Sequence, residues 1–537
     1  MSLLRHSSAV CLGYIALAFA VYGAFLNNPF MMDDEIQVVE NSHIHSLAHL
    51  PSLFVSSTMG SGGGTSARGI YYKPLMTSYY TVIWHFFGAE PAAYRVPLLI
   101  LHTLSAFLIF LLSGRLFVGA HARLWSFALG LIFLLHPVNA EVVLYIADAQ
   151  DILYMFFGLF SLFLIMRLRS GFGLGFALTL SLTCAVLSKE TGVLFLAIAS
   201  AYACLWLPDK LKTVLLSATL VGATYGVVRV SIGFTQVQSS ELILHHLSYF
   251  ERLLMLPMIL THHMEILLIP WRLSLSVDFP LKDLGAREFW LPLLCILVGL
   301  VSLIGVCRRL QQMGERRAWA FFIGVLVLWF LLHSHVLVPL DGLYADRWLY
   351  LVTWAGPSLL LLWLNREFHY RSAGALRPLY VGVIASLILV GYAIRDVIRA
   401  QDWSDALALY QRELSLHPRD AIMNNNVGVE LFRRGLWPQA IPYFEKATTL
   451  NPRSGVAWNN LGACAERQKN DSLAATYYSR AIEVSGYPLA FENFAKLLIR
   501  NQRLDEARSF LEKEALPRFP HNPLFAEMRA FLAKESR

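Results

Sequence analysis

Charged side chains are scarce in this chain. Only 15% of its 537 residues are Asp, Glu, Lys or Arg, and 56% are hydrophobic, whereas soluble domains carry about 25% charged residues. This composition excludes an ordinary soluble protein. The net charge of +7 does not indicate nucleic-acid binding, because the Lys and Arg residues lie in short loops between apolar segments, as in proteins whose loop charges set membrane topology.

Cysteine is scarce too and forms no pattern. The six cysteines lie mostly in apolar segments without a Cys-x-x-Cys pair, which predicts neither a disulfide framework nor a zinc site. The sequence also lacks a nucleophile elbow and a His-Glu-x-x-His motif. The close histidine pairs have no zinc-like spacing with further ligands: His245 with His246, His262 with His263, and His333 with His335. We therefore predict no metal site, and the sequence leaves a divalent-metal requirement open.

Long apolar windows are what the chain has in abundance. Windows of about 20 residues, long enough to cross a bilayer, recur from residue 8 to about 398 and then stop. The first is interpreted as an uncleaved span rather than a signal peptide, because it is longer than a usual signal core. Eleven spans are predicted, near 8–26, 93–114, 124–140, 149–166, 172–187, 190–207, 211–231, 289–306, 318–339, 347–364 and 378–396.

Loop charges orient these spans. The positive-inside rule places the N-terminus and residues 308–317 in the cytoplasm, and residues 27–92 and 399–537 outside. Residues 249–269 would reverse every later loop if they crossed, so they are predicted to be a re-entrant or interfacial helix. The expected fold is all-α, with a membrane domain over residues 1–398 whose first outside loop is 27–92.

Residues 399–537 contain an internal repeat. Alanines recur at 34, 34 and 33 residues, and an aromatic residue or leucine follows each by four; these are Ala406, Ala440, Ala474 and Ala507 with Tyr410, Phe444, Tyr478 and Leu511. A period of 34 with small and aromatic positions is the tetratricopeptide pattern. We predict a repeat solenoid of about three repeats (421–454, 455–487 and a degenerate 488–521) plus a half repeat at 402–419.

Acidic and basic residues gather at the predicted outside ends of the spans. Residues 27–41 leave the first span with three adjacent carboxylates, which are costly near hydrocarbon unless they are used. Each cluster alone has a structural alternative: Lys189 with Glu190 as an ion pair, or His136 as a helix-end cap. The clusters predicted on this face are Asp33-Asp34-Glu35, Tyr71 to Leu75, His136 to Glu141, Asp148 with Asp151, Ser188-Lys189-Glu190, Pro270-Trp271-Arg272, and Asp341 to Trp348. The glycine-rich segment 56–69 lacks a P-loop ending and is expected to be a mobile loop over this face.

Such a face suits group transfer at the membrane boundary. A carboxylate can accept a proton from an incoming hydroxyl, while Lys and Arg bind a phosphate and stabilise it as a leaving group. A lipid-phosphate donor would reach the site through the bilayer. The repeats would hold an acceptor polypeptide, since such arrays present a concave groove.

At these residues the chain resembles the transmembrane and tetratricopeptide-repeat family of protein O-mannosyltransferases, which belong to the multi-span GT-C class. Residues 30–41 resemble the first-loop Asp-Asp motif of that family. The other matching segments are Tyr72 to Leu75 (Tyr-Arg-Pro-Leu), His136 to Glu141 (His-Pro-Val-His-x-Glu), Leu187 to Gly192 (Ser-Lys-Glu-x-Gly) and Asp346 to Leu349 (Glu-Arg-x-Leu). Lys73 replaces an arginine and Asn139 a histidine, which leaves the donor sugar and the acceptor open.

The residues are assigned roles as follows. Asp34 is the predicted base and Asp33 the brace, because Asp33 is nearer the span and neighbouring side chains alternate in an extended loop; the reverse assignment stays open. The donor phosphate is assigned to Lys73, Lys189, Arg347 and Arg272, with Glu35, His136, Glu141 and Glu190 in support. Asn424, Asn425, Asn459 and Asn460 on first helices of repeats are assigned to the acceptor backbone, with a solvated polar face as the alternative.

The function predicted from these residues and from the resemblance is transfer of mannose or another hexose from a polyprenyl phosphate to a Ser or Thr hydroxyl. A non-catalytic assembly factor and a transporter are the alternatives; the transporter would need acids at mid-membrane. The short repeat region favours a bacterial protein of the inner membrane with its site in the periplasm, over an enzyme of the endoplasmic reticulum lumen. The sequence does not decide between an inverting and a retaining reaction.

Overall fold

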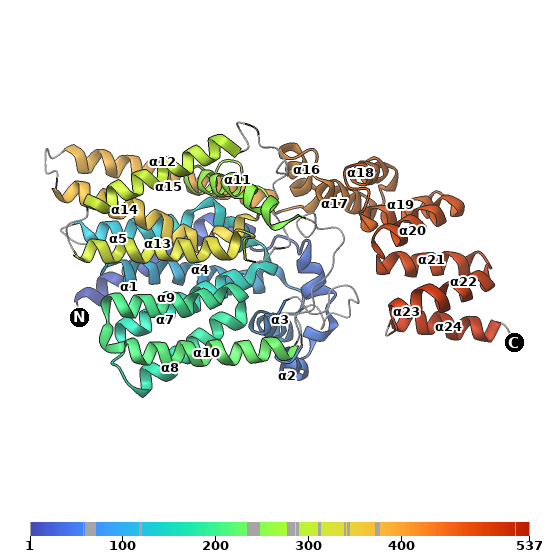
Figure 1. Cartoon of the computed structure of the whole chain (residues 1–537), viewed down its shortest axis with the longest axis horizontal. Coiled ribbons are helices and arrows are strands. Elements are labelled where there is room, and N and C mark those ends of the chain that lie inside the picture. The colour runs from blue at the N-terminus through green and yellow to red at the C-terminus, as the bar shows by residue number, and fades with distance from the viewer. Residues whose placement is uncertain are drawn as a thin grey trace. The chain divides into compact units, whose positions relative to one another are not determined.

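The computed structural model describes residues 2–56, 58, 71–117, 121–232, 247–275, 285, 289–309, 313–337, 340, 344–370, 376–520 and 522–535. All regular structure in these residues is helical, which confirms the all-α fold class (Figure 1). The described residues form two compact units, one ending at Asp405 and the other beginning at Ala406. The glycine-rich segment 59–69 and Asp341 lie outside the described residues.

A helix occupies each of the eleven predicted spans. The helices are α1 (Ser2–Tyr22), α4 (Pro91–Ser113), α5 (Ala122–Leu135), α7 (Ala149–Arg167), α8 (Phe172–Ser188), α9 (Leu194–Trp206), α10 (Leu211–Ile232), α12 (Leu291–Arg309), α13 (Met313–His333), α14 (Val352–Tyr370) and α15 (Leu376–Asp402). Within the described residues, six helices are long and apolar enough to cross a membrane, and α5 forms a bent pair with the segment after it. The chain is a multi-pass membrane protein.

The core of this unit is built around α4 and α7. In their span windows 61% and 72% of the residues are buried, against 22% for the window that contains α10 and 6% for α12. α7 packs against α4, α8 and α9, and Gly158 leaves room on α7 for the Phe195 ring of α9, which a Cβ atom would meet. Helix α11 (Tyr249–Leu268) begins with a capping box formed by Ser248 and Glu251; whether it crosses the membrane stays a prediction.

Polar segments interrupt the bundle where helices begin or end. Pro137 starts a 3-10 turn after α5, and two short elements, α6 (Ala140–Leu144) and a 3-10 turn (Ile146–Asp148), precede α7. A further 3-10 turn, Glu190–Val193, separates α8 from α9, and Asp346–Tyr350 precedes α14. The first loop contains 3-10 turns and α2 (Leu50–Leu53) before α3 (Pro74–Phe87). The acidic and basic motifs therefore lie on short turns between longer helices.

The second unit is a series of paired helices. Its members are α16 (Ala406–Leu416), α17 (Ala421–Arg433), α18 (Trp437–Leu450), α19 (Gly455–Arg467), α20 (Asp471–Ser485), α21 (Pro488–Arg500), α22 (Leu504–Phe510), α23 (Leu516–Arg518) and α24 (Pro523–Glu535). A Cβ atom at Gly428 or Gly462 would meet the buried ring of Phe444 or Tyr478 on the second helix of the same repeat. The small and aromatic positions of the sequence pattern therefore pack as predicted.

Candidate active site at the helix ends

Asp34 is the best-anchored carboxylate of the first loop. It is fully buried, and its Oδ1 accepts a hydrogen bond from the backbone N–H of Ala147 at 2.7 Å. Its Oδ2 accepts from the N–H of Met31 at 3.4 Å and lies 3.9 Å from Nη2 of Arg95. Burial raises the pKa of Asp34 from 3.8 to about 7, although Arg95 and the hydrogen bonds act in the opposite direction. Asp34 therefore ties the loop to the bundle.

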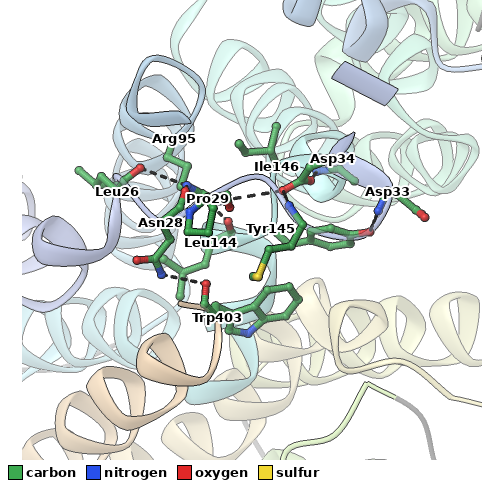
Figure 2. A network of polar contacts seen from close by, with 12 residues as sticks. Leu26, Asn28, Pro29, Asp33, Asp34, Arg95, Leu144, Tyr145, Ile146 and Trp403 are labelled. Carbon is green, nitrogen blue, oxygen red and sulfur yellow. Dashed lines mark hydrogen bonds and ion pairs between the residues drawn. The ribbon is translucent and has the colours of Figure 1, made fainter. Parts of the chain in front are cut away.

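Arg95 on α4 supports the same loop through hydrogen bonds to its backbone. Its side chain is 1% exposed and its guanidinium donates to the carbonyls of Leu26, Asn28 and Pro29 at the start of the loop, and to that of Leu144. Figure 2 shows these contacts converging on Arg95. A buried guanidinium is stable only when its donors are paired, and here the loop backbone pairs them.

Asp33 occupies the opposite environment. Its residue is exposed, while its backbone N–H donates to the hydroxyl of Tyr145 at 3.1 Å. The expectation that Asp33 braces the loop and Asp34 faces outward is therefore wrong about the brace. The expectation assumed an extended loop, but Asp34 has helical backbone angles and follows a turn at Met32 with a φ of 56°. Adjacent side chains in a helical turn diverge by about 100°, so one is buried and the other exposed.

Two of the predicted phosphate-binding cations are held by carboxylates of the chain. Nη1 of Arg347 lies 2.8 Å from Oε1 of Glu141, and its Nε lies 3.5 Å from Oδ1 of Asp148. Nζ of Lys189 contacts both oxygens of Asp151 at 2.7 and 2.8 Å. Lys189 thus forms a structural ion pair, with Asp151 rather than with its neighbour in sequence.

Glu190 instead supports the segment that carries Lys73. Its Oε1 accepts the backbone N–H of Tyr72 at 3.0 Å and lies 3.9 Å from Nη2 of Arg229 on α10. Glu190 therefore joins the start of α3 to α10, across 118 residues of sequence from Tyr72.

Lys73 is a predicted phosphate-binding cation whose ammonium donors have no partner among the described residues. Its ammonium lies 4.1 Å from the centroid of the Tyr71 ring and has no hydrogen bond or ion pair among the described residues. Its pKa is lowered by desolvation, with Lys189 acting in the same direction, while the charges of Glu190, Asp151 and Asp148 oppose the shift. Lys73 is thus a half-buried cation among the charged groups of two other segments, 148–151 and 189–190, and its N–H donors can bind an anion.

Three other predicted site residues have different surroundings. Nε2 of His136 bonds the carbonyl of Leu267 at 2.9 Å, and its Nδ1 accepts the N–H of Val138, as the helix-cap interpretation requires. Glu35 begins a π-helical turn, Glu35–Val39, and is half-buried. Arg272 is exposed, and no contact in the described part of the chain joins it to Lys73 or Arg347.

Arg95 and Tyr145 are site residues that the sequence analysis missed. Each is linked to the Asp33–Asp34 turn, yet Arg95 lies 61 residues from Asp34 and Tyr145 lies 112 from Asp33. One available signal was the position of Arg95 inside an apolar window of 23 residues, because ionisable residues in such segments are rare and functional. Tyr145 carries no comparable signal.

The asparagines of the repeats divide into two groups. Asn424 is fully buried, and its amide donates to the carbonyl of Asp420 at 2.6 Å, so its assignment to the acceptor is corrected; Asn459 is buried as well. Asn425 and Asn460 are half-buried, and Nδ2 of Asn460 donates to Oδ1 of Asn425 at 2.9 Å. Asn493 on α21 donates to Asn459 at 2.9 Å, which extends this row across three repeats.

Comparisons with known proteins agree with this architecture. A family model described as tetratricopeptide repeat matches residues 393–449 and 428–488. Over 433 residues the chain is 24% identical to a protein O-mannosyl-transferase of Caenorhabditis elegans, covering 79% of this chain and 60% of the relative. The chain is a homologue of the transmembrane and tetratricopeptide-repeat family.

Further relatives bear the same name. Protein O-mannosyl-transferase TMTC4 of Mus musculus is 23% identical over 484 residues, covering 79% of this chain and 64% of the relative. TMTC2 of the same species is 27% identical over 196 residues, covering 35% and 23%. The chain thus spans less than two thirds of the length of these relatives. The predicted resemblance to the transmembrane and tetratricopeptide-repeat O-mannosyltransferases is confirmed.

Proposed function

We propose that the protein is a membrane glycosyltransferase that moves a hexose such as mannose from a polyprenyl phosphate to a Ser or Thr hydroxyl of a polypeptide. The names of its homologues support a protein O-glycosyltransferase, and the apolar helices support a donor that arrives in the bilayer. The further proposal, that the donor is lipid-linked, depends on the phosphate-binding residues of the candidate site. A periplasmic site in a bacterial inner membrane stays a prediction from sequence.

Lys73 carries the proposal. A sugar phosphodiester has one negative charge, and among the described cations near Asp148, Lys73 is the one whose hydrogen-bond donors are open, whereas Lys189 and Arg347 already contact carboxylates. Charge-assisted hydrogen bonds from an ammonium are stronger than neutral ones. In the proposed complex, Lys73 binds the donor phosphate, and the Arg347 and Lys189 pairs fix the walls of the site.

Asp33 is the proposed general base. Its exposed carboxylate can reach a hydroxyl of an acceptor, while buried Asp34 and the Tyr145 hydroxyl hold its backbone. In the transfer step, Asp33 takes the hydroxyl proton and the hydroxyl oxygen bonds to the anomeric carbon. The bond from that carbon to the phosphate oxygen breaks, and its electron pair leaves on the phosphate next to Lys73.

The repeat unit is the proposed acceptor-binding domain. Asn425, Asn460 and Asn493 are half-buried on successive first helices, and an amide side chain can donate to and accept from a peptide backbone. This row therefore suits a polypeptide held without a strict sequence requirement. It replaces the set predicted from sequence, from which the buried residues Asn424 and Asn459 are removed.

A donor-binding assay on the purified protein tests the role of Lys73. Lys73→Ala should weaken binding of the polyprenyl-phosphate sugar by about 10- to 100-fold, since a hydrogen bond to a charged group contributes about 1.5–3 kcal/mol. Lys73→Arg should restore most of the affinity, and Lys212→Ala, at an exposed lysine elsewhere, should leave it unchanged. Equal donor affinity in Lys73→Ala would contradict the assignment.

Lys73→Ala together with Asp33→Asn distinguishes an enzyme from a non-catalytic assembly factor. A non-catalytic factor would keep its cellular function in both Lys73→Ala and Asp33→Asn, and the wild-type protein would transfer no sugar in vitro. Intact-mass measurement of secreted proteins from cells with and without the gene would show the loss of hexose increments only if the protein is a transferase.

A further inference from the structure

The last turn of α15 is capped by the first loop. Nδ2 of Asn28 donates to the carbonyl of Trp403 at 3.0 Å and to that of Ala400 at 3.4 Å. The last carbonyls of a helix have no partner within the helix, so Asn28 supplies what the end of α15 lacks. The segment just before the repeat unit, which begins at Ala406, is therefore bonded directly to the loop that carries Asp33.

A second contact joins Trp403 to the support of Asp33. The rings of Trp403 and Tyr145 lie 5.2 Å apart between centroids, tilted by 32°, and Trp403 is 1% exposed. The hydroxyl of the same tyrosine accepts the backbone N–H of Asp33. Removing the indole would leave a cavity beside Tyr145, and buried aromatic groups relax into such space only in part.

Arg95 closes the network. It donates to the carbonyls of Asn28 and Pro29 and lies 3.9 Å from Asp34. The backbone of Asn28 is thus fixed to α4 while its side chain is fixed to α15. Figure 2 shows the contacts of Arg95 with the loop, the hydrogen bond from Asn28 to Trp403, and the Trp403 ring beside Tyr145.

We propose that Asn28 and Trp403 are positioning residues. Asn28 lies on the first loop and Trp403 on the segment that leads into the repeat unit, and their contacts hold Asp33 where it can accept a proton from the acceptor hydroxyl. The inference rests on the proposed function of Asp33. Trp403 is separated from the first repeat helix, α16, by Ser404 and Asp405 alone. Neither Asn28 nor Trp403 is among the charged groups that act on Lys73. Their contact is therefore expected to affect the chemical step and not the binding of the donor.

Point variants of the full-length protein test this role. Trp403→Ala and Asn28→Ala should lower kcat for transfer by about 10- to 100-fold, the size expected when a reacting group is displaced by about 1 Å, while KM for the polyprenyl-phosphate sugar changes less than about twofold. Trp403→Phe should keep most of the activity, because it retains a ring beside Tyr145 and the indole N–H has no hydrogen bond among the described residues. Asn27→Ala is the matched control, since Asn27 is exposed and makes no described hydrogen bond.

Hydrogen exchange of residues 27–41 gives a readout that does not depend on activity. Trp403→Ala and Asn28→Ala should speed exchange in this segment, and Asn27→Ala should not. Unchanged exchange, or a loss of donor affinity and melting temperature without a specific fall in kcat, would overturn the proposal. A wild-type protein that transfers no sugar but shows the predicted exchange pattern would refute the proposed function while the positioning contact stands.

Discussion

Replacing Asp33 and Asp34 one at a time by asparagine separates a reacting carboxylate from a supporting one. The substitution nearly preserves shape and removes the ionisable group. Asp33 is exposed, so Asp33→Asn should leave the fold intact. Its kcat should fall by about 10²–10⁴-fold, the usual contribution of a general base, which corresponds to about 3–5 kcal/mol in the activation barrier.

Asp34→Asn should instead change how stability depends on pH. The pKa of Asp34 is raised from 3.8 to about 7, so its protonated form is the one that the folded state favours. That contribution is complete below pH 3.8 and is lost as the pH rises through about 7. With about 1.4 kcal/mol per pKa unit, the wild type should lose about 4 kcal/mol over this range relative to a variant that cannot ionise at this position.

The assay measures the melting temperatures of the wild type, Asp34→Asn, Asp33→Asn and the exposed-site control Glu40→Gln in detergent from pH 4 to pH 8. The stability of the wild type relative to Asp34→Asn should fall as the pH rises from 4 to about 7 and then level off, whereas Glu40→Gln and Asp33→Asn should follow the wild type. Parallel pH curves for the wild type and Asp34→Asn would refute the burial argument. Full transfer activity in Asp33→Asn would show that Asp33 is not the base.

Three further outcomes are expected. Arg95→Lys should lower the melting temperature and kcat together, because an ammonium cannot reproduce the guanidinium contacts to four carbonyls; an unchanged melting temperature would contradict this. Gly462→Val should unfold the repeats locally, since its Cβ would meet the Tyr478 ring, and proteolysis of the repeat unit in membranes measures this. A cysteine replacing exposed Lys513 should react with an impermeant thiol reagent in spheroplasts, and one replacing Arg169 should not, in a background without native cysteines; the reverse pattern would invert the topology.

The helices and the repeats could be predicted from sequence because their signals are local. Apolar windows of about 20 residues and a 34-residue period each lie within one stretch of chain, and the structure has helices at those positions. The paired small and aromatic residues, such as Gly428 with Phe444, also follow from the period. Such patterns identify elements without knowledge of how the elements meet.

The site was predictable in its parts and not in its connections. The structural alternative for Lys189 was an ion pair with its neighbour Glu190, yet its partner Asp151 lies 38 residues away on α7. Asp34, and not Asp33, braces the loop, because the chain makes a helical turn where an extended loop was assumed. Asn424 resembled Asn425 in sequence, and only packing shows that one is buried. Each error concerns a tertiary contact or a local turn that residue type does not specify.

The candidate site contains four basic and four acidic side chains, and this balance affects which anions it can bind. Lys73, Lys189, Arg229 and Arg347 lie among Glu141, Asp148, Asp151 and Glu190. Burial raises the pKa of Glu141 to about 7 and that of Asp148 to about 8, so the eight formal charges cancel above about pH 8. A neutral group of charges produces little field beyond the Debye length of about 8 Å at physiological salt. At that pH these eight groups should attract soluble phosphates and nucleotides only weakly, and such anions should compete poorly. A donor anchored by a lipid tail needs no such attraction, because the bilayer itself concentrates it at the mouth of the site, and its capture should therefore vary little with ionic strength.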